Sequence, residues 1–279
     1  MLHATMIVSP LSSLRILITG GSGFIGTELV IALAKLQHDV LVLDLNFNKI
    51  FDSYSNISFI EGNFTSISSI SRYLVDIDIL VHLAAFLGVD KCENSAQSVL
   101  DINGLATCQL FFAAREAGVR SVIYTSSSEV YGDCEMATET SVVAPKSDYG
   151  VSKLFAERYL SCLTNSEFKA VSFRLFSVYG KNQRPDFVIP KFIQQVKQNL
   201  PITVHGDGSQ VRAYCHINDI ITGIISTIST LNFLPQYTLL NLGNNREPLT
   251  VVELANTILA LANKNGYSSS IAFVPLENT

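Results

Sequence analysis

The stretch RILITGGSGFIGTELV, residues 15–30, predicts a strand, a glycine-rich turn and a helix in immediate succession. Its first part is an unbroken apolar run, as expected for a strand that is buried on both faces of a parallel sheet. The residues after the glycines, through residue 37, place apolar side chains at helical spacing. A strand that feeds a helix in this way begins a βαβ unit, so the stretch predicts an α/β fold.

The same alternation of strands and helices continues to about residue 180. Short runs rich in β-branched residues predict five further strands: 39–45, 56–64, 77–85, 119–128 and 169–180. The longest helical pattern, residues 99–118, ends at a glycine that suits a helix C-terminus. Alternation at this pitch predicts a Rossmann-type, doubly wound parallel sheet with right-handed crossovers.

The pattern then changes. Residues 187–200 and 250–264 have helical spacing, and residues 202–214 predict a turn-rich hairpin. The sequence has no clear linker, so we expect the later region to pack on the first as a smaller, interleaved C-terminal cap. We therefore expect a dinucleotide-binding domain in residues 1–180 and a cap that is mostly substrate-binding in residues 181–279.

The glycine-rich turn has the spacing of a dinucleotide-binding loop. Gly20 and Gly23 allow a tight turn and a close approach of the backbone, and Gly26 allows the helix to pack against the strand. The helix begins with free N–H groups and a positive dipole, which suit a pyrophosphate. These N–H groups belong to Phe24, Ile25 and Gly26.

Asp44 closes the next predicted strand, 18 residues beyond Gly26. A carboxylate at this position accepts hydrogen bonds from ribose hydroxyls and repels a 2′-phosphate. No arginine neighbours Asp44 in the sequence. We therefore expect NAD as the cofactor, rather than NADP.

A second group of polar residues follows the predicted strand 119–128. TSSSEVYGD, residues 125–133, places hydroxyls and a carboxylate at the strand's end. Further on, Tyr149 and Lys153 are four residues apart and share one face of a predicted helix. Tyrosine has an ordinary pKa of about 10, and a nearby ammonium lowers that pKa. With a serine hydroxyl, the pair can take a proton from a sugar hydroxyl while a hydride leaves the same carbon.

Composition argues against several classes of protein. The net charge is -5 and Lys and Arg form no run, which argues against a nucleic-acid partner. The five cysteines are scattered without a CxxC pair, which favours free thiols in a reducing compartment over a metal site. No apolar run reaches the ~18 residues of a membrane span, and the first residues do not resemble a signal peptide. We expect a cytoplasmic protein without a metal or a membrane partner.

Five motifs occur in a characteristic order: TGGSGFIG (19–26), HLAA (82–85), the serine-rich strand end with VYG (125–132), YGVSK (149–153) and RLFSVYG (174–180). Together they resemble the extended short-chain dehydrogenase/reductase family, in its branch of NAD-dependent nucleotide-sugar epimerases and dehydratases. The similarity runs from about residue 15 to residue 259. It implies further cofactor contacts at Asn63, Phe64, Leu83, Ala84 and Ala85, with Asn63 in place of the common aspartate.

The resemblance assigns roles to the polar residues. It implies that Ser127 holds the substrate hydroxyl, that Tyr149 acts as the base, and that Lys153 binds the nicotinamide ribose and tunes Tyr149. Ser128 and Glu129 occupy the positions where 4,6-dehydratases have an acid–base Asp-Glu pair and sugar-acid decarboxylases have Ser-Glu. Glu129 thus assists elimination, assists decarboxylation, or only forms hydrogen bonds at the wall of the site.

On the substrate side, Ser177 stands where the family has an asparagine that contacts the phosphates. Arg212 matches a family arginine that binds the diphosphate. The family also implies a homodimer, formed by the two helices that contain Asn103 and Tyr149. The sequence ends at Thr279, where family members usually continue with a further substrate-binding segment, so we expect a short cap.

We therefore expect an enzyme that acts on a nucleotide sugar, with 4-epimerisation through transient oxidation at sugar C4 and hydride return as the leading reaction. One alternative is a UDP-sugar-acid decarboxylase or a 4,6-dehydratase that uses Glu129. An alternative of another class is a non-catalytic NAD(H)-binding regulatory protein on the same fold.

Overall fold

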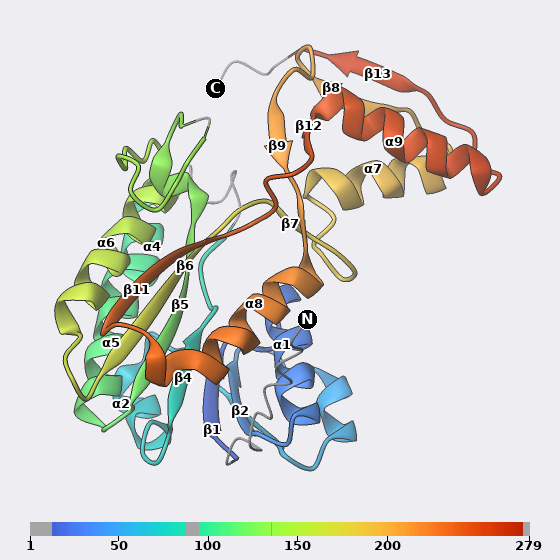
Figure 1. Ribbon diagram of the computed structural model, residues 1–279. Helices are drawn as coiled ribbons and strands as arrows, with labels where there is room; N and C mark the ends of the chain where they lie inside the picture. Colours follow the sequence, from blue (N-terminus) through green and yellow to red (C-terminus); the bar gives the residue numbers. More distant parts are fainter. Residues whose placement is uncertain (1–12, 88–94, 135, 276–279) are drawn as a thin grey trace, which may run out of the picture. The chain divides into compact units, whose positions relative to one another are not determined.

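The computed structural model describes residues 13–87, 95–134 and 136–275, and the chain forms two compact units (Figure 1). The first unit comprises Met1–Leu175 and Ile221–Asn241, and the second comprises Phe176–Ile220 and Leu242–Thr279. The units are thus interleaved along the chain, and residues 221–241, expected in the cap, belong to the first. The assignment of cofactor and substrate roles to the two sides of residue 180 stays a prediction.

A seven-stranded sheet forms the centre of the first unit, in the order β11-β6-β5-β4-β1-β2-β3. Its strands are β1 (Arg15–Thr19), β2 (Asp39–Asp44), β3 (Ile57–Glu61), β4 (Ile79–His82), β5 (Ser121–Ser127), β6 (Lys169–Leu175) and β11 (Tyr237–Leu242). All neighbouring pairs among β1 to β6 are parallel. The strand order reverses at β1, which confirms the predicted doubly wound sheet and marks the edge where such folds bind ligands.

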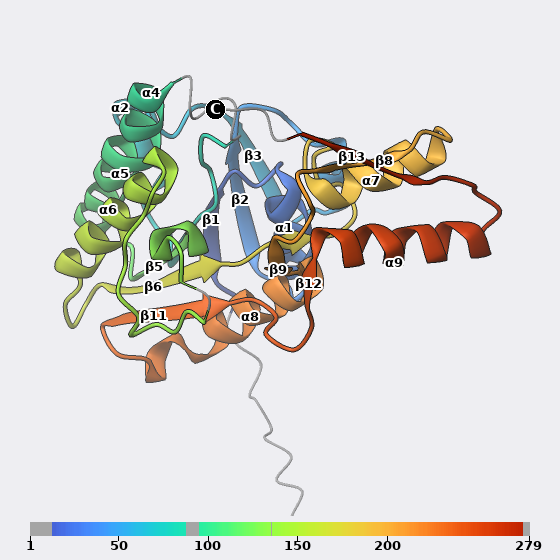
Figure 2. The same cartoon turned by 90° about the horizontal axis from the view of Figure 1, so that it is seen from above.

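Helices cover both faces of this sheet. They are α1 (Phe24–Lys35), α2 (Ile67–Ile70), α4 (Ala96–Val99), α5 (Thr107–Glu116), α6 (Asp148–Leu163) and α8 (Ile217–Thr230), with short 3-10 turns at Lys49–Ser53, Ser71–Tyr73, Ser128–Tyr131 and Leu231–Phe233. A π-helical segment, Leu100–Ala106, joins α4 to α5, so the predicted long helix is confirmed. Figures 1 and 2 show α4, α5 and α6 on one face and α1 and α8 on the other. Leu17, Val122, Phe111 and Leu160 are buried together in the core between the sheet and α5 and α6.

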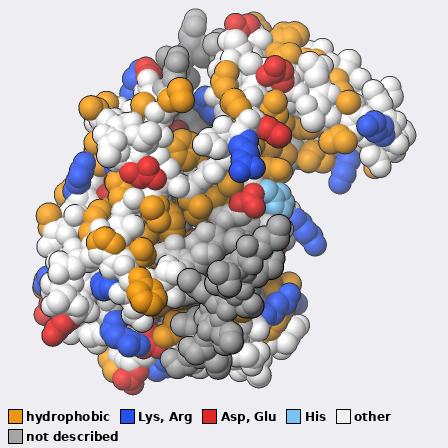
Figure 3. All heavy atoms as spheres, in the orientation of Figure 1, with side chains coloured by type: hydrophobic (Ala, Val, Ile, Leu, Met, Phe, Trp, Pro, Cys, Tyr) orange, Lys and Arg blue, Asp and Glu red, His pale blue; other side chains and the backbone are white. Residues whose placement is uncertain are grey.

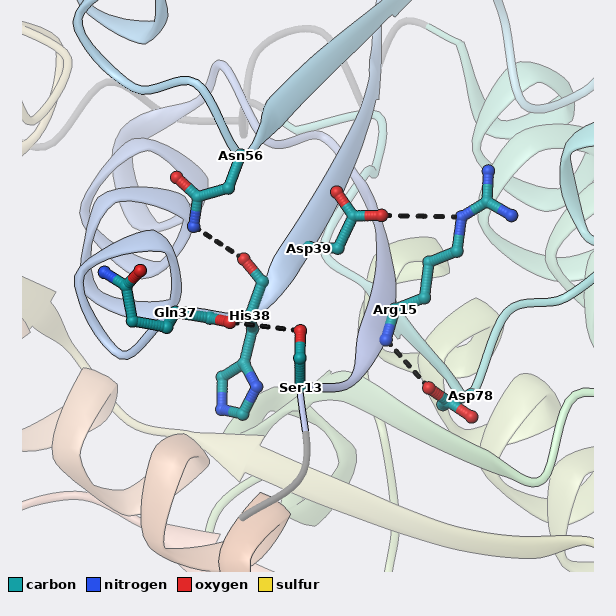
Figure 4. Close-up of polar contacts among 7 residues, drawn as sticks. All are labelled: Ser13, Arg15, Gln37, His38, Asp39, Asn56 and Asp78. Carbon is teal, nitrogen blue, oxygen red and sulfur yellow. Dashed lines mark hydrogen bonds and ion pairs between the residues drawn. The ribbon is translucent and has the colours of Figure 1, made fainter. Parts of the chain in front are cut away.

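Polar contacts fasten the amino ends of the central strands (Figure 4). The backbone N–H of Arg15 donates to Asp78 before β4 at 2.8 Å, and the Arg15 side chain pairs with Asp39 in β2. The side-chain amide of Asn56, just before β3, donates to the His38 carbonyl at 2.7 Å. These contacts lie at the opposite edge of the sheet from the motifs, which therefore occupy the carboxyl ends of the strands.

The second unit has short strands and two helices around its own core. Its elements are β7 (Val178–Tyr179), α7 (Val188–Lys197), β8 (Ile202–His205), β9 (Val211–Ala213), β10 (Cys215–His216), β12 (Pro248–Thr250), α9 (Val251–Lys264) and β13 (Ile271–Val274). Phe192, Val196, Ile202, Val204 and Leu254 are buried in that core.

The hairpin predicted for residues 202–214 is wrong. Strand β8 pairs in parallel with β13, and β9 pairs antiparallel with β12, so the two halves of the expected hairpin have partners elsewhere. The turn residues in this stretch suggested a hairpin, and Gly206 and Gly208 do have the positive φ of tight turns. Pairing with distant segments nevertheless determines the arrangement.

No helix among the described residues is long and apolar enough to span a membrane.

Figure 3 shows that Lys and Arg side chains on the visible face lie singly among apolar and acidic ones.

The core of the first unit provides a direct test of the packing. Phe168, which precedes β6, is 2% exposed, whereas Phe233 is 89% exposed. We expect Phe168→Ala to lower the free energy of unfolding by about 3–5 kcal/mol, because it removes a buried ring and leaves a cavity. Phe233→Ala, the matched control, should leave the urea midpoint close to wild type. Equal midpoints for the two variants would contradict the burial of Phe168 in the core.

Candidate active site

The turn between β1 and α1 brings three backbone segments into close contact. Gly20 has a φ of +73°, and a Cβ there would lie 2.7 Å from the Ala84 nitrogen. A Cβ on Gly26 would lie 2.2 Å from the Gly20 carbonyl oxygen. Side chains at either position would therefore push apart β1, the end of β4 and α1. The glycines let these elements meet, as the sequence predicts.

The first turn of α1 presents unpaired donors at this edge of the sheet. Its N-cap is Gly23, no side chain caps the helix, and no acidic residue occupies the first turn. The first N–H groups of a helix have no partner within the helix, and the helix dipole makes this end positive. The buried Ser22 Oγ also has no hydrogen-bond partner among the described residues. These donors fit an anionic group such as a pyrophosphate.

Asp44 lies at the carboxyl end of β2, next to the same turn. Its carboxylate accepts hydrogen bonds from the backbone N–H of Ser22 at 3.0 Å and of Asn46 at 3.2 Å. A carboxylate has about four acceptor positions, so two contacts leave others for ribose hydroxyls. Asp44 is therefore held against the glycine-rich turn, and acceptor positions are left for a ribose.

The other residues predicted to contact the cofactor follow β3 and β4. Leu83 donates its backbone N–H to the Thr19 carbonyl at 3.1 Å, and Ala84 and Ala85 follow directly. The Asn63 side chain accepts from the N–H of Thr65 at 3.1 Å. The Phe64 ring is buried and packs edge-on against His82, with 4.8 Å between ring centroids. Little of Phe64 is therefore exposed, and its contact with the cofactor stays a prediction.

The end of β5 carries Ser127 into a short 3-10 turn. Ser127 Oγ accepts a hydrogen bond from the backbone N–H of Glu129 at 3.2 Å. A Cβ on Gly150, at the start of α6, would lie 2.9 Å from the Glu129 carbonyl oxygen. This contact brings the first turn of α6, and with it Tyr149, to the turn that holds Ser127. Ser128 is half-buried and Glu129 is exposed.

Helix α6 carries Tyr149 and Lys153 one turn apart. Ser147 caps this helix by accepting the N–H of Gly150 at 3.0 Å. Lys153 is only 3% exposed, and its Nζ donates to the Thr125 carbonyl oxygen at 2.8 Å. The same Nζ lies 4.9 Å from the centroid of the Tyr124 ring and 5.6 Å from that of Tyr149. The structure thus brings Lys153 to the base expected in this site.

Burial changes the acid–base behaviour of Lys153. Loss of water around the ammonium lowers the pKa of Lys153 to about 7, and the carboxylate of Glu157 acts in the opposite direction. A lysine with such a pKa changes charge within the physiological range. Its protonated form stabilises a phenolate at Tyr149.

In the second unit, Ser177 and Arg212 line the same pocket, of about 160 Å³. The other lining residues are mostly apolar or aromatic: Val178, Tyr179, Gln183, Phe187, Val188, Ile189 and Tyr214. Arg212 is exposed and donates to the Val211 carbonyl at 2.8 Å, which leaves most of its guanidinium donors for a ligand. The two residues singled out for substrate binding therefore lie together.

Sequence reasoning missed several buried polar residues. His82 Nδ1 lies 2.6 Å from Thr19 Oγ1, and His82 Nε2 lies 3.1 Å from Thr107 Oγ1, so both ring nitrogens are occupied. Burial, together with the Lys153 charge, holds the pKa of His82 well below its usual value. Glu157 and Arg174 form a buried ion pair behind Lys153. The sequence did contain one indication of this pair, because Arg174 lies within the apolar strand 169–175.

No group of three or more His, Cys, Asp or Glu side chains is placed to hold a metal ion in the part of the chain that the structure describes.

Comparisons with known proteins identify the family. Residues 16–243 match the model of the NAD dependent epimerase/dehydratase family. An uncharacterized UDP-glucose epimerase, YtcB, of Bacillus subtilis is 30% identical over 94% of this chain and 87% of the relative. The dTDP-D-glucose 4,6-dehydratase of Homo sapiens is 31% identical over 92% of this chain and 76% of the relative.

Two further comparisons bear on the chemistry. A UDP-N-acetyl-alpha-D-glucosaminuronate decarboxylase of Bacillus cytotoxicus is 30% identical over 94% of this chain and 84% of the relative. The crystal structure of a Bacillus cereus UDP-glucuronic acid 4-epimerase with UDP-glucuronic acid and NAD is 29% identical, with a TM-score of 0.84, over 94% of this chain and 87% of that one.

The chain belongs to the NAD dependent epimerase/dehydratase family, and the resemblance inferred from its motifs is confirmed. It is an enzyme of this NAD-dependent family, so NAD is its cofactor, as expected from Asp44. This result argues against the alternative of a non-catalytic regulatory protein.

The glycine contacts predict how the cofactor site responds to a single methyl group. In Gly26→Ala the added carbon would meet the Gly20 carbonyl at 2.2 Å and Gly21 Cα at 2.6 Å, so the turn must shift. We expect affinity for NAD, measured by calorimetry, to fall by roughly tenfold or more, equivalent to about 1.4 kcal/mol. In the control Gly104→Ala, the new carbon would make only an ordinary 3.4 Å contact with Phe155. Unchanged affinity in Gly26→Ala would argue against this loop as the pyrophosphate site.

Proposed function

We propose that this chain is a nucleotide-sugar 4-epimerase in which Ser127, Tyr149 and Lys153 form the reaction centre. The placement of Lys153 carries the proposal. Its buried ammonium is bonded to the Thr125 carbonyl at 2.8 Å and lies 5.6 Å from the centroid of the Tyr149 ring. A buried ammonium beside a phenol favours the phenolate, which makes the tyrosine a base near neutral pH.

The residues at the adjacent strand ends suit NAD. The uncapped start of α1 and the unpaired Ser22 hydroxyl would hold the pyrophosphate. Asp44 would accept hydrogen bonds from the ribose hydroxyls. When bound, NAD supplies an acceptor for the hydride from sugar C4 and returns that hydride within the same turnover.

The chain's own side chains handle the proton. Tyr149 takes the proton of the C4 hydroxyl and later gives it back. Ser127 Oγ already accepts the Glu129 N–H, which leaves its O–H to hold the sugar oxygen in place. Lys153 stabilises the phenolate of Tyr149 before it takes this proton and again after the proton has been returned.

The proposed substrate carries a pyrimidine nucleoside diphosphate, as do the UDP- and dTDP-sugars in the names of the relatives. The support is the pocket of the second unit, where aromatic side chains and the Arg212 guanidinium line one space. A guanidinium fork matches the geometry of phosphate oxygens. Ser177 offers fewer hydrogen bonds than the family asparagine, which weakens this part of the site.

Decarboxylation and 4,6-dehydration remain the alternatives, since relatives with those names match most of the chain. Both would require Ser128 and Glu129 to act on the oxidised sugar. The Glu129 side chain is exposed, and its backbone N–H already serves Ser127. This arrangement favours a role for Glu129 at the wall of the site, and hence epimerisation.

The proposal includes a homodimer, and a cytoplasmic location remains a prediction from the sequence. Support for the dimer comes from exposed apolar side chains on α6 and on the helix formed by α5 and the π-helical segment before it: Leu100, Leu105, Phe112, Val151 and Phe155. Leu105 and Phe112 are seven residues apart and Val151 and Phe155 are four apart, so the members of each pair share a helix face. The same two helices contain Asn103 and Tyr149.

Tyr149→Phe should abolish most turnover. Removal of the phenol oxygen deletes the base, which costs on the order of 10²–10⁴ in rate. Tyr159→Phe, a control on the same helix, should keep wild-type turnover, and both variants should still bind NAD. The assay follows a panel of UDP- and dTDP-sugars by NMR. Full activity in Tyr149→Phe would exclude Tyr149 as the base.

The same panel distinguishes epimerisation from its alternatives. We expect a C4-inverted sugar, no net reduced nicotinamide, and near wild-type turnover in Glu129→Gln. Release of carbon dioxide or formation of a 4-keto-6-deoxy sugar, with loss of activity in Glu129→Gln, would instead establish one of the alternatives.

Phe155→Glu should convert the dimer into monomers, because it places a charge within an apolar interface. Sedimentation velocity at micromolar concentration measures the outcome, with Phe233→Glu, outside this surface, as the control. A wild-type protein that sediments as a monomer would contradict the homodimer.

A further inference from the structure

A buried ion pair lies behind the reaction centre and has no part in the mechanism above. Arg174 in β6 donates to Glu157 in α6 through Nε at 3.0 Å and through Nη2 at 2.8 Å. Their side chains are 1% and 2% exposed. In every other ion pair among the described residues, both side chains are at least 26% exposed. Burial of two charges is costly, so this pair needs a physical explanation.

The helix places this pair in line with the reaction centre. Tyr149, Lys153 and Glu157 follow one another at intervals of four residues on α6, so they share one face. Glu157 is therefore one turn beyond Lys153. Arg174 is the register partner of Ser126, the residue before Ser127. The pair thus lies between the helix that carries the base and the strand end that carries Ser127.

The surroundings of Lys153 contain few charges to hold an ammonium. Tyr124 faces it from β5, Tyr149 and Glu157 from α6, and His82 from β4. Tyr124 and His82 are buried, and burial raises the pKa of Tyr124 well above its usual value and lowers that of His82, so both are neutral near pH 7. Among these four described residues, Glu157 is the one with a carboxylate, and its charge opposes the loss of the Lys153 proton.

Arg174 explains how a carboxylate can stay charged in this position. Its two N–H groups bind both oxygens of Glu157, which is the bidentate geometry of an ionised pair. The guanidinium itself stacks on the Tyr131 ring, 4.7 Å from its centroid. The Tyr131 hydroxyl donates to Asn241 Oδ1 at 2.6 Å, so the support continues to β11.

We propose that Glu157 is a positioning residue of the reaction centre: it keeps the Lys153 ammonium charged behind Tyr149, and Arg174 holds the carboxylate in place. The inference builds on the proposed role of Lys153 but does not depend on which sugar is turned over. A structural role alone would stabilise α6 against β6 and leave the charge of Lys153 unaffected.

The test measures the protonation of Lys153 directly, by NMR of the full-length protein with 13Cε-labelled lysine. Lys153→Met identifies the signal. The titration midpoint is compared in wild type, Glu157→Gln and the double variant Glu157→Gln/Arg174→Met. The double variant is needed because the single one leaves Arg174 as an unpaired buried cation. Apolar replacement of a buried pair often preserves stability. Glu116→Gln, in the exposed pair with Arg115, is the matched control.

We expect a wild-type midpoint of about 7 and a midpoint lower by about one pH unit in the double variant, with Glu116→Gln unchanged. Glu157→Gln alone should lower the midpoint further, because the unpaired Arg174 cation also repels the ammonium. A double variant that folds and titrates like wild type would overturn the proposal. Failure of both Glu157 variants to fold would also count against it, because the pair would then serve the fold alone.

The proposed function and this inference can fail separately. A lowered midpoint in a protein that turns over no nucleotide sugar would support the role of Glu157 and refute 4-epimerisation. An unchanged midpoint in an active epimerase would support 4-epimerisation and refute the role of Glu157.

Discussion

The backbones of Gly20, Gly26 and Ala84 meet without any side chain between them, and most of the site depends on that contact. Helix α1 packs directly on the turn, and its first N–H groups are therefore exposed at the carboxyl ends of the strands. The same contact places the turn beside Asp44, whose carboxylate binds the Ser22 N–H. Main-chain packing thus fixes the first turn of α1 and the Asp44 carboxylate, the predicted contacts of the pyrophosphate and the ribose, relative to each other.

A set of buried hydrogen bonds joins this edge to the reaction centre. Thr125 uses both of its groups: its hydroxyl donates to the His82 carbonyl, and its carbonyl accepts from Lys153. The His82 ring lies between Thr19 and Thr107. These contacts tie β1, β4, β5, α5 and α6 together. Buried polar groups are costly unless they are paired, so such a network favours one arrangement over its alternatives.

Most of the first unit could be predicted because the residues that define its elements lie close together in the sequence. The strand β1, the glycines and Asp44 are close in sequence, and Tyr149 and Lys153 are one helical turn apart. Features that depend on distant pairing were not predictable in this way. The segment 221–241 returns to the first unit, β8 pairs with β13 instead of β9, and Glu157 meets Arg174 only after α6 and β6 have docked. Burial of the Phe64 ring in the core was likewise not predictable, and its contact with the cofactor stays a prediction. Periodicity does not reveal which neighbour covers a given side chain.

The interleaving of the two units has a consequence for how the chain is made. Synthesis runs from the N-terminus, and the sheet of the first unit gains its last strand, β11, only once residues 237–242 have emerged. Strand β8 (residues 202–205) has been synthesised by then, but its partner β13, which ends at Val274, has not. Neither unit can complete its strand pairing until a later part of the chain has been synthesised. Until then β6 lacks its partner β11, and β8 lacks its partner β13. Unpaired strand edges can pair with other chains, so the incomplete chain exposes surfaces that the finished protein covers with its own strands.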